Sequence, residues 1–229
     1  MNNRQLFIVG ITGSMGCGKS AVTRLFSRLG ARTLDADQLA RQIMEPGEPG
    51  WQEVVAAFGE ETLMDGESSG QNRPLDRKKL GILVFSDPQK RALLESIIHP
   101  KVEAAQAEVL YRWEREQSRD SDRIVVMEIP LLFESGADHR CDLTVTVTCG
   151  QQQMQRLSNR RGMSEQVKQA AIARQLSESE KIERADRTID NGKSWKETER
   201  EVERLWQEVT LLANKPGSRV WPSHWHQDG

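Results

Sequence analysis

The segment "GITGSMGCGKS" (residues 10–20) places four glycines within eleven residues and ends on Lys-Ser. The apolar run before it, residues 6–11, is short and bounded by glycine, as is typical of a buried strand. The run after it, residues 20–30, repeats apolar side chains at helical spacing and ends on glycine. The sequence therefore predicts a strand, a glycine-rich turn and a helix, in that order.

The spacing Gly13-x-x-x-x-Gly18-Lys19-Ser20 is that of a phosphate-binding loop. Glycines let the main chain wrap closely around a di- or triphosphate and aim its N–H groups at the anion. The helix that begins near Lys19 adds unpaired N–H groups and the positive end of its dipole. Lys19 supplies a mobile charge for the outer phosphates, and the Ser20 hydroxyl is a candidate Mg²⁺ ligand. A glycine-rich turn that binds nothing is the alternative, which the order of strand, loop and helix disfavours.

The chain has 229 residues, enough for one domain with sizeable insertions, and a formal net charge of -2. Because there is no basic excess, the charge balance gives no support to nucleic-acid binding. No apolar run is long enough to span a membrane, and the short one near the N-terminus already serves the first strand. We therefore expect neither a membrane segment nor a signal peptide.

Cysteine occurs at three positions, Cys17, Cys141 and Cys149. The odd number and a spacing that matches no metal site favour a reducing, cytoplasmic setting. Cys17 lies inside the glycine-rich turn, where we expect it to serve as a small residue, with redox control as the alternative.

Four further segments are predicted to form strands, the last of them weakly: residues 31–37, 123–134, 142–149 and 187–191. Long helical stretches separate them, which indicates parallel strands and crossover helices in an α/β fold. Residues 52–119, with an exposed loop at 65–74, and the Arg-rich residues 151–184 exceed a simple crossover. Both are predicted to be helical insertions that cover a ligand at the carboxyl ends of the strands.

Three carboxylates follow predicted strands. Asp35 and Asp37 close the second strand in "LDAD", where one of them can orient and deprotonate an acceptor hydroxyl. A helix N-cap is the other role for an aspartate at this place, and the two residues can share the two roles. Glu128 ends the third strand, either as an acid that holds Mg²⁺ through water or as a solvated strand-end carboxylate.

Two prolines restrict the backbone around them. Pro130 is expected to stop the third strand, and Leu131 and Phe133 after it are candidates for core or pocket wall. His99 precedes Pro100, which disfavours a helical conformation at the histidine. A lone histidine of this kind is more often a hydrogen-bonded structural residue than a ligand.

The stretch "QRLSNRR" places Arg156 and Arg160 four residues apart, on one face of the predicted helix. Two guanidinium groups there suit a transferring phosphoryl group, because charge moves onto its oxygens as the bond breaks. A solvated, Arg-rich helix face is the commoner meaning of such a run, and the phosphate loop earlier in the chain favours the functional interpretation.

Taken together, these motifs resemble the dephospho-coenzyme A kinase family. The resemblance extends to about residue 212 and includes "GITGSMGCGKS", "LDADQLARQ", "PGEPG", "LDRKKLGILVFSDP", "IIHP", "IPLLFE", "QRLSNRR" and "IDNG", in this order. It implies a parallel-sheet core like that of P-loop nucleoside-triphosphate hydrolases, with a helical substrate-binding insertion and a helical lid. It assigns the nucleotide-binding core to residues 1–51, 120–150 and 185–212, the coenzyme-substrate domain to 52–119 and the lid to 151–184. Residues 213–229 have no counterpart in the family. Their Pro, Gly, Ser and His content and lack of periodicity predict a loose tail, with docking of Trp221 and Trp225 on the body as the alternative.

The resemblance also implies ATP- and Mg²⁺-dependent phosphorylation of the ribose 3′-hydroxyl of dephospho-coenzyme A, the last step of coenzyme A biosynthesis, by a cytoplasmic monomer or small homo-oligomer. Asp37 would be the base, assisted by Lys19, Arg156 and Arg160. Ser20 and Glu128 would hold the metal. ATP would contact Gly13, Ser14, Met15, Gly16, Cys17, Gly18, Lys19, Ser20, Ala21, Asn191 and Gly192. The acceptor would contact Asp37, Arg41, Arg77, His99, Leu131 and Phe133.

The chain departs from the family pattern at four positions. Ser14 and Cys17 stand where the family usually has Gly and Ser, but both still offer a backbone N–H, so the ATP site is little affected. Arg161 and Gly162 stand where acidic residues are frequent, which leaves the lid contacts less defined.

Two other functions are compatible with a phosphate loop. The first is a kinase for another small hydroxyl acceptor, such as a nucleoside or nucleotide; "IIHP" and "LDRKKL" favour the coenzyme instead. The second is a nucleotide-dependent switch. A guanine-specific switch would carry an Asn-Lys-x-Asp reader after a late strand, and "IDNGKS" and "ANKPG" do not fit that pattern.

Overall fold

The computed structural model describes residues 6–65, 73–116, 120–150, 169 and 172–214. The chain divides into two compact units, one of Met1–Asp35 with Val109–Gly229 and the other of Ala36–Glu108. The second unit begins at Ala36, sixteen residues before the predicted insertion at residue 52. The difference arises because the unit includes the helix that follows the second strand, which was expected to belong to the core. Each unit is described by itself.

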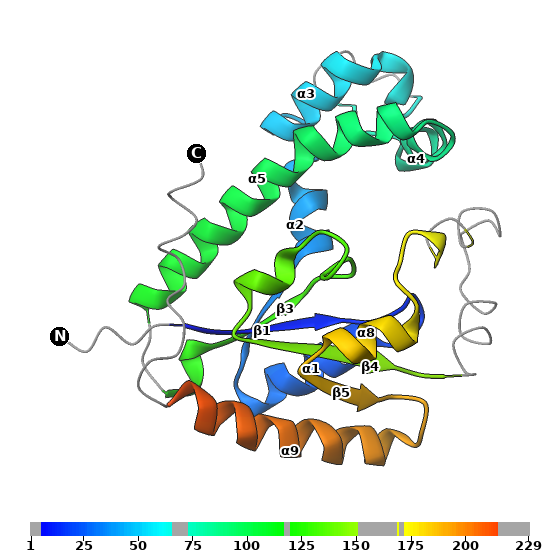
Figure 1. Cartoon of the computed structure of the whole chain (residues 1–229). Helices are drawn as coiled ribbons and strands as arrows, with labels where there is room; N and C mark the ends of the chain where they lie inside the picture. The colour runs from blue at the N-terminus through cyan, green and yellow to red at the C-terminus, as the bar shows by residue number, and fades with distance from the viewer. Residues whose placement is uncertain (1–5, 66–72, 117–119, 151–168, 170–171, 215–229) are drawn as a thin grey trace. The chain divides into compact units, whose positions relative to one another are not determined.

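A five-stranded parallel sheet forms the centre of the first unit (Figure 1). The strands are β1 (Phe7–Thr12), β2 (Arg32–Asp35), β3 (Ile124–Glu128), β4 (Leu143–Thr148) and β5 (Arg187–Asp190). Their order is β2-β3-β1-β4-β5, and every neighbouring pair is parallel. The predicted α/β fold is thus confirmed, and all five carboxyl ends meet at one edge of the sheet.

Burial explains how clearly each strand shows in the sequence. All positions of β1, β3 and β4 are buried, so these strands read as continuous apolar or β-branched runs. β5 lies at an edge of the sheet with Arg187 and Thr188 exposed, which accounts for its weak signal. β3 covers only part of the segment 123–134. It ends at Glu128 and the backbone enters turns from Pro130, which confirms Glu128 as the strand end and the expected stop at Pro130.

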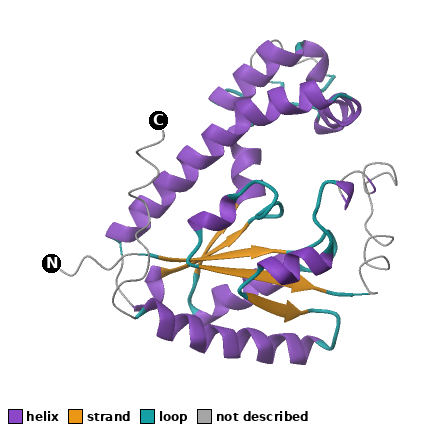
Figure 2. Cartoon of the chain, viewed as in Figure 1, coloured by secondary structure: helices purple, strands orange, loops and turns teal. Residues whose placement is uncertain are grey.

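Helices cover both faces of the sheet (Figure 2). α1 (Lys19–Leu29) and α9 (Trp195–Ala213) share one apolar core with Phe7, Val9 and Ile11 of β1. On the opposite face a Cβ atom at Gly10 would lie 2.6 Å from Cys141 Sγ, so the segment after β3 packs directly on the strand backbone. The short helix α8 (Glu178–Arg184) also covers this face, where its Lys181 carbonyl accepts the Thr146 hydroxyl at 3.1 Å.

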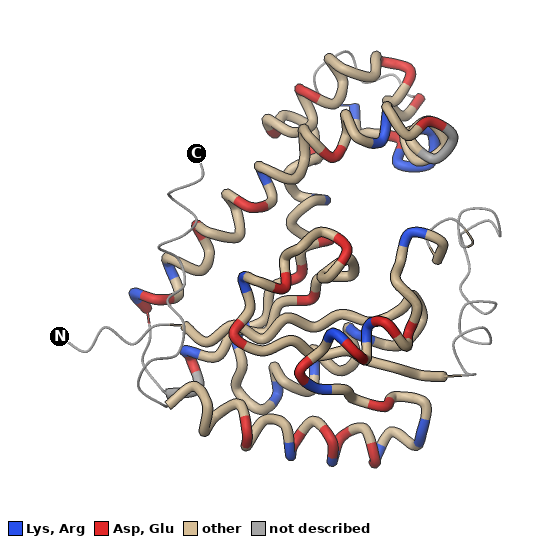
Figure 3. Tube along the Cα trace, viewed as in Figure 1, with Lys and Arg blue, Asp and Glu red and all other residues tan. Residues whose placement is uncertain are grey.

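Along α9, acidic and basic positions alternate on the side of the trace that faces away from the sheet (Figure 3). The helix begins with a capping box in which Ser194 and Glu197 each bond the backbone of the other. Within the described residues, no helix combines the length and the apolar character that crossing a membrane requires.

The second unit is helical, as predicted for most of its length. It contains α2 (Ala36–Ile43), α3 (Pro49–Phe58), the 3₁₀ helix η1 (Glu60–Thr62), α4 (Arg77–Ser86) and the first part of α5 (Pro88–Arg115). Its core consists of Trp51, Val54, Phe58, Leu63, Leu75, Leu80 and Ile98. Ala40, Ile43 and Met44 of α2 pack against this core, which is why α2 belongs to this unit.

His99 is helical, although its position before Pro100 disfavours that conformation. α5 continues through Pro100 as one helix of 28 residues, and His99 is an exposed residue within it. A proline inside a helix removes one backbone donor and displaces the carbonyls of the preceding turn. Lys101 Nζ donates to the Ile97 carbonyl in that turn at 3.2 Å, and Ile98 is buried in the core of the unit, so side-chain contacts outweigh the local preference.

A buried ion pair holds α8 to the segment after β3. Lys181 is fully buried, and its Nζ lies 3.3 Å from Glu134 Oε1, which also accepts the Leu176 N–H at 2.7 Å. We expect Lys181→Met to lower the free energy of unfolding by about 3–5 kcal/mol, because it leaves the Glu134 carboxylate buried without a counter-charge. Urea denaturation followed by circular dichroism measures this.

The matched control is the double variant Lys181→Met/Glu134→Gln. Glutamine keeps an oxygen for the Leu176 N–H but carries no charge, so the double variant should recover a large part of the loss. Equal stability of the single and double variants would show that the uncompensated charge is not the cause.

Candidate functional site

The predicted strand, loop and helix are confirmed. β1 ends at Thr12, α1 begins at Lys19, and the loop between them has positive φ values at Gly13 (145°), Gly16 (88°) and Gly18 (85°). Residues other than glycine are strained at these positive φ values. At Gly13 a Cβ atom would also lie 2.3 Å from the Val147 carbonyl oxygen. Backbone geometry therefore accounts for glycine at these three positions.

The loop of residues 13–18, called the glycine ring below, presents main-chain groups at the amino end of α1. Gly18 is the N-cap residue and supplies no side-chain acceptor, while its carbonyl accepts the Ala21 N–H at 2.9 Å. Within the loop, the Cys17 N–H donates to the Ser14 carbonyl at 3.2 Å. An anion at this helix end would meet backbone N–H groups and the positive end of the helix dipole.

Charged and hydroxyl side chains surround the ring. Lys19 Nζ lies 2.8 Å from the Gly13 carbonyl oxygen, so its ammonium group is held at the loop. Ser20 Oγ donates to Glu128 Oε1 at 2.9 Å, and Thr23 Oγ1 lies 3.5 Å from Glu128 Oε2. β3 thus brings the buried Glu128 carboxylate to the serine that the sequence analysis named as a metal ligand.

Asn191 bonds the backbone of the loop. Its Nδ2 donates to the Cys17 carbonyl at 2.7 Å, its Oδ1 accepts the Thr198 hydroxyl at 3.2 Å, and its backbone N–H bonds the Thr148 carbonyl. The buried amide therefore fixes the loop to the ends of β4 and β5. The adenine contact predicted for Asn191 and Gly192 remains a prediction.

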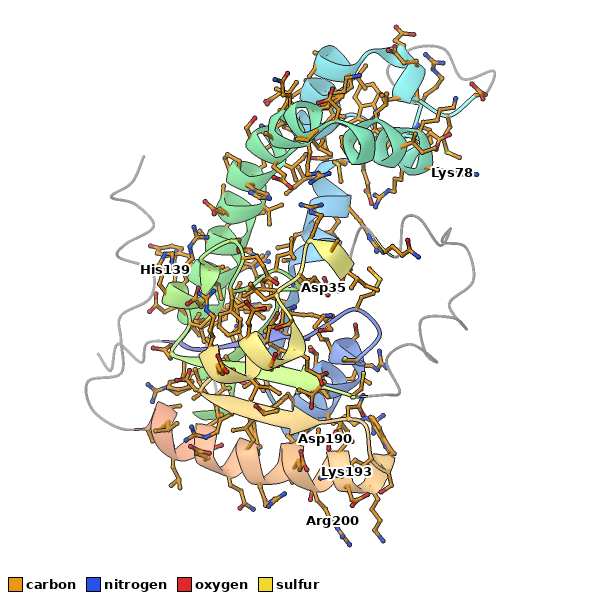
Figure 4. All side chains as sticks on the ribbon, turned by 45° about the vertical axis from the view of Figure 1, so that its right-hand side comes forward. Asp35, Lys78, His139, Asp190, Lys193 and Arg200 are labelled. Carbon is orange, nitrogen blue, oxygen red and sulfur yellow. The ribbon has the colours of Figure 1, made fainter. Side chains whose placement is uncertain are left out.

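The turn from β5 into α9 is ordered by its own polar groups. Asp190 Oδ1 accepts the Gly192 N–H at 2.8 Å, and Lys193 Nζ lies 3.4 Å from Asp190 Oδ2. Figure 4 shows Asp190 and Lys193 close together at this turn and Arg200 projecting outward from α9.

Sequence reasoning missed Gln175. Its side-chain Oε1 accepts the Met15 N–H of the loop at 2.9 Å, and its Nε2 lies 3.4 Å from the Pro130 carbonyl, which also accepts the Thr12 hydroxyl. One amide therefore joins the loop after β1, the segment after β3 and the chain that leads into α8. Since 160 residues separate Gln175 from Met15, no local pattern could have identified it.

Phe133 and Leu131 follow β3 in the same unit. Phe133 is buried, and the Arg184 guanidinium carbon lies 4.8 Å from the centre of its ring. Leu131 is half-buried, and its carbonyl accepts the Ser135 hydroxyl at 2.7 Å. The observed contacts give Phe133 a packing role within the first unit; acceptor binding by these residues remains a prediction.

Asp35 and Asp37 lie in different elements. β2 ends at Asp35, which is in register with Glu128, so the predicted strand 31–37 extends two residues too far at its carboxyl end. Asp37 is exposed in the first turn of α2 and belongs to the second unit. Asp35, the last residue of β2, can be located by its label in Figure 4. The role of Asp37 as a base remains a prediction.

The other acceptor residues are on helices of the second unit. Arg77 Nη2 lies 3.3 Å from the Arg41 carbonyl, so α2 and the start of α4 bring these two arginines together. His99 is exposed on α5. Arg156 and Arg160 lie outside the described residues.

Burial decides the protonation of the loop cysteine. Loss of solvation raises the pKa of the Cys17 thiol far above its ordinary value, and the nearby Cys149 and Glu178 raise it further. Cys17 is therefore a neutral thiol at physiological pH. The loop does not carry a thiolate that would repel a phosphate.

Comparisons with known proteins agree on one family. The family model described as dephospho-CoA kinase matches residues 7–197. A dephospho-CoA kinase of Streptomyces avermitilis is 40% identical over 210 residues, which cover 91% of this chain and 97% of the relative. One from Syntrophotalea carbinolica is 38% identical, over 86% of this chain and 89% of the relative.

Two solved structures are similar to this chain over most of its length. A crystal structure from Thermus thermophilus matches with a TM-score of 0.71 at 33% identity, covering 89% of this chain and 98% of that one. The structure of a dephospho-CoA kinase from Campylobacter jejuni matches with a TM-score of 0.63 at 26% identity, covering 90% and 98%.

Proposed function

This chain belongs to the dephospho-CoA kinase family, and from that premise we propose that it transfers the γ-phosphoryl group of ATP to the ribose 3′-hydroxyl of dephospho-CoA, giving CoA and ADP. The observation that carries the ATP part is the glycine ring at the amino end of α1, with Lys19 held against it and the Ser20–Glu128 pair beside it. The family membership carries the choice of acceptor.

The chemistry assigned to the residues follows from where charge develops. In the loose transition state of phosphoryl transfer, negative charge spreads over the oxygens of the transferred group. The loop N–H groups and Lys19 would stabilise that charge, joined by Arg156 and Arg160 of the proposed lid. Asp37 would align the 3′-hydroxyl and accept its proton as the new P–O bond forms and the bond to ADP breaks.

The residues beside the loop fit a magnesium ion. Mg²⁺ prefers oxygen ligands and keeps several of its waters. A serine hydroxyl and a buried carboxylate supply such oxygens, and Ser20 Oγ and Glu128 Oε1 lie 2.9 Å apart. When bound, the ion would neutralise charge on the outer phosphates. Glu128 would hold its water ligands and orient Ser20.

Glu128→Gln tests this assignment. We expect the Mg²⁺ concentration for half-maximal activity to rise about 10–100-fold, because the variant loses the charge that holds the metal's water ligands. A magnesium titration at saturating ATP measures it. Thr23→Val is the matched control, since Thr23 contacts the other carboxylate oxygen at 3.5 Å and should change the titration little. An unchanged magnesium requirement in Glu128→Gln would contradict the role of Glu128.

The two units and the lid divide the remaining tasks in this proposal. The unit that contains the sheet would bind ATP, and the helical unit would bind the coenzyme. The predicted lid, residues 151–184, would close over the phosphates and exclude water through the part that precedes α8, which packs on the sheet. Residues 213–229 would take no part in the reaction. The location would be cytoplasmic, and the assembly a monomer or small homo-oligomer.

A coupled ADP assay tests the whole reaction. With ATP and Mg²⁺ present, we expect ADP to form when dephospho-CoA is added and almost none without it. Product phosphorylated on the ribose 3′ position, identified by mass spectrometry and NMR, would establish the acceptor. ADP formation without an acceptor would favour a nucleotide-hydrolysing switch, and faster turnover with a nucleoside would favour the other kinase.

A further inference from the structure

Two thiols meet beneath the glycine ring. Cys17 Sγ lies 2.6 Å from Cys149 Sγ, although 132 residues separate them in the sequence. Cys17 is a residue of the loop itself, and Cys149 directly follows β4. Both side chains are buried, with exposed fractions of 0% and 1%, and neither is in a disulfide. The two reduced sulfurs are therefore closer together than sulfurs that are merely packed against each other.

We propose that Cys17 and Cys149 are an oxidation site, at which a small-molecule disulfide converts the two thiols into a reversible cross-link between the phosphate loop and the end of β4. Only a small movement of either side chain brings the sulfurs to bonding distance. The loop residue is thus both a part of the proposed ATP site and one half of the thiol pair.

A metal site is the competing use of these groups. Glu178 in the first turn of α8 completes a set of three ligand atoms that all lie within 4.8 Å of one another. Two sulfurs bound to one tetrahedral ion at about 2.3 Å would be roughly 3.8 Å apart. The observed 2.6 Å is much shorter, and Glu178 Oε2 already accepts the Cys149 N–H at 3.2 Å. The geometry favours a bond between the sulfurs over an ion between them.

The reaction is thiol–disulfide exchange and balances without another reagent. The thiolate of one cysteine attacks a small-molecule disulfide RSSR, forms a mixed disulfide and releases RS⁻, which takes up the proton that the cysteine has lost. The second cysteine then attacks the protein sulfur of the mixed disulfide and releases a second RSH. The two thiols are oxidised to one protein disulfide, and RSSR is reduced to two RSH.

Because both thiols are buried, the rate of oxidation depends on how often the loop opens. Loss of solvation raises the pKa of Cys17, so little thiolate exists while the loop is packed, and RSSR cannot reach a fully buried sulfur. Oxidation must therefore pass through an opening of the loop. A ligand that binds only the packed loop lowers the open population, by about 100-fold at a concentration 100 times its Kd.

This last step depends on the proposed function, because it places ATP on the loop. ATP with Mg²⁺ should slow the oxidation, while the cross-link itself depends only on the two cysteines. The two ideas can therefore fail separately in one experiment.

The experiment exposes reduced protein to hydroxyethyl disulfide, with and without saturating ATP and Mg²⁺, and follows the cross-link by mass spectrometry. We expect the intact protein to lose two hydrogen atoms and a non-reduced digest to contain the Cys17 peptide joined to the Cys149 peptide. Dithiothreitol should reverse both. Cys141→Ser is the matched control, because Cys141 is also buried but contacts the Ala137 carbonyl instead of a thiol, and the variant should still form the cross-link.

Cys17→Ser and Cys149→Ser should each abolish the cross-link, and the wild-type digest carries the conclusion even where a variant folds poorly. Free thiols at both positions after prolonged exposure, or mixed disulfides alone, would overturn the proposal. A cross-link that forms at the same rate with and without ATP would support the oxidation site and contradict the placement of ATP on this loop.

Discussion

Replacing Lys19 by methionine should lower the turnover number by about 10²–10³-fold, the usual loss for one charge-stabilising group of an active site. In the structure the Lys19 ammonium group lies 2.8 Å from the Gly13 carbonyl and 3.4 Å from the Ser14 carbonyl, which places its charge at the mouth of the glycine ring. Methionine keeps the length and apolar part of the side chain but removes that charge. The coupled ADP assay measures turnover at saturating ATP and dephospho-CoA.

The fold should survive this change, because the buried core of the unit is formed by other residues. Circular dichroism and the melting temperature check that. Lys196→Met is the matched control, since Lys196 is an exposed lysine in the first turn of α9 and should keep the parent turnover. Wild-type turnover in Lys19→Met would show that the phosphoryl group is not transferred at this loop.

Replacing Asp37 by asparagine should reduce turnover by about 10²–10⁴-fold, the usual contribution of a positioned general base. Asparagine has nearly the same shape but cannot accept the proton of the ribose hydroxyl. ATP affinity should remain close to that of the parent, because ATP binding is assigned to the glycine ring. Turnover is measured with the ADP assay and ATP affinity by calorimetry.

Asp35→Asn distinguishes the two aspartates. Asp35 ends β2 in register with Glu128, whereas Asp37 lies in the first turn of α2. If Asp37 is the base, Asp35→Asn should lose much less turnover than Asp37→Asn. The reverse order would assign the base to Asp35, and parent-like turnover in both variants would remove the aspartates from the mechanism.

The sequence predicted those parts of the site that depend on local structure. Gly13, Gly16 and Gly18 have backbone angles that other residues rarely adopt, so the pattern of glycines reports the loop directly. The buried strands β1, β3 and β4 were recognisable because parallel strands covered on both faces are apolar throughout. Glu128, the last residue of β3, was predicted to hold Mg²⁺ as phosphate-loop enzymes often do, and the structure places its carboxylate 2.9 Å from Ser20 Oγ.

The missed parts depend on contacts between distant segments. The local effect of Pro100 disfavoured a helical conformation at His99, but the core around Ile98 keeps α5 continuous. α2 was assigned to the sheet unit because it directly follows β2, although its apolar side chains pack against α3. Gln175, and the hydrogen bond from Asn191 to the Cys17 carbonyl, join residues more than a hundred positions apart, which periodicity and spacing do not report.

The order of the strands has a consequence for how the chain folds during synthesis. β1 pairs only with β3 and β4 in the described sheet, so it has no strand partner there until more than a hundred further residues have been made. During that interval its apolar surface is available to chaperones or to other nascent chains. Native pairings this far apart also favour slow folding.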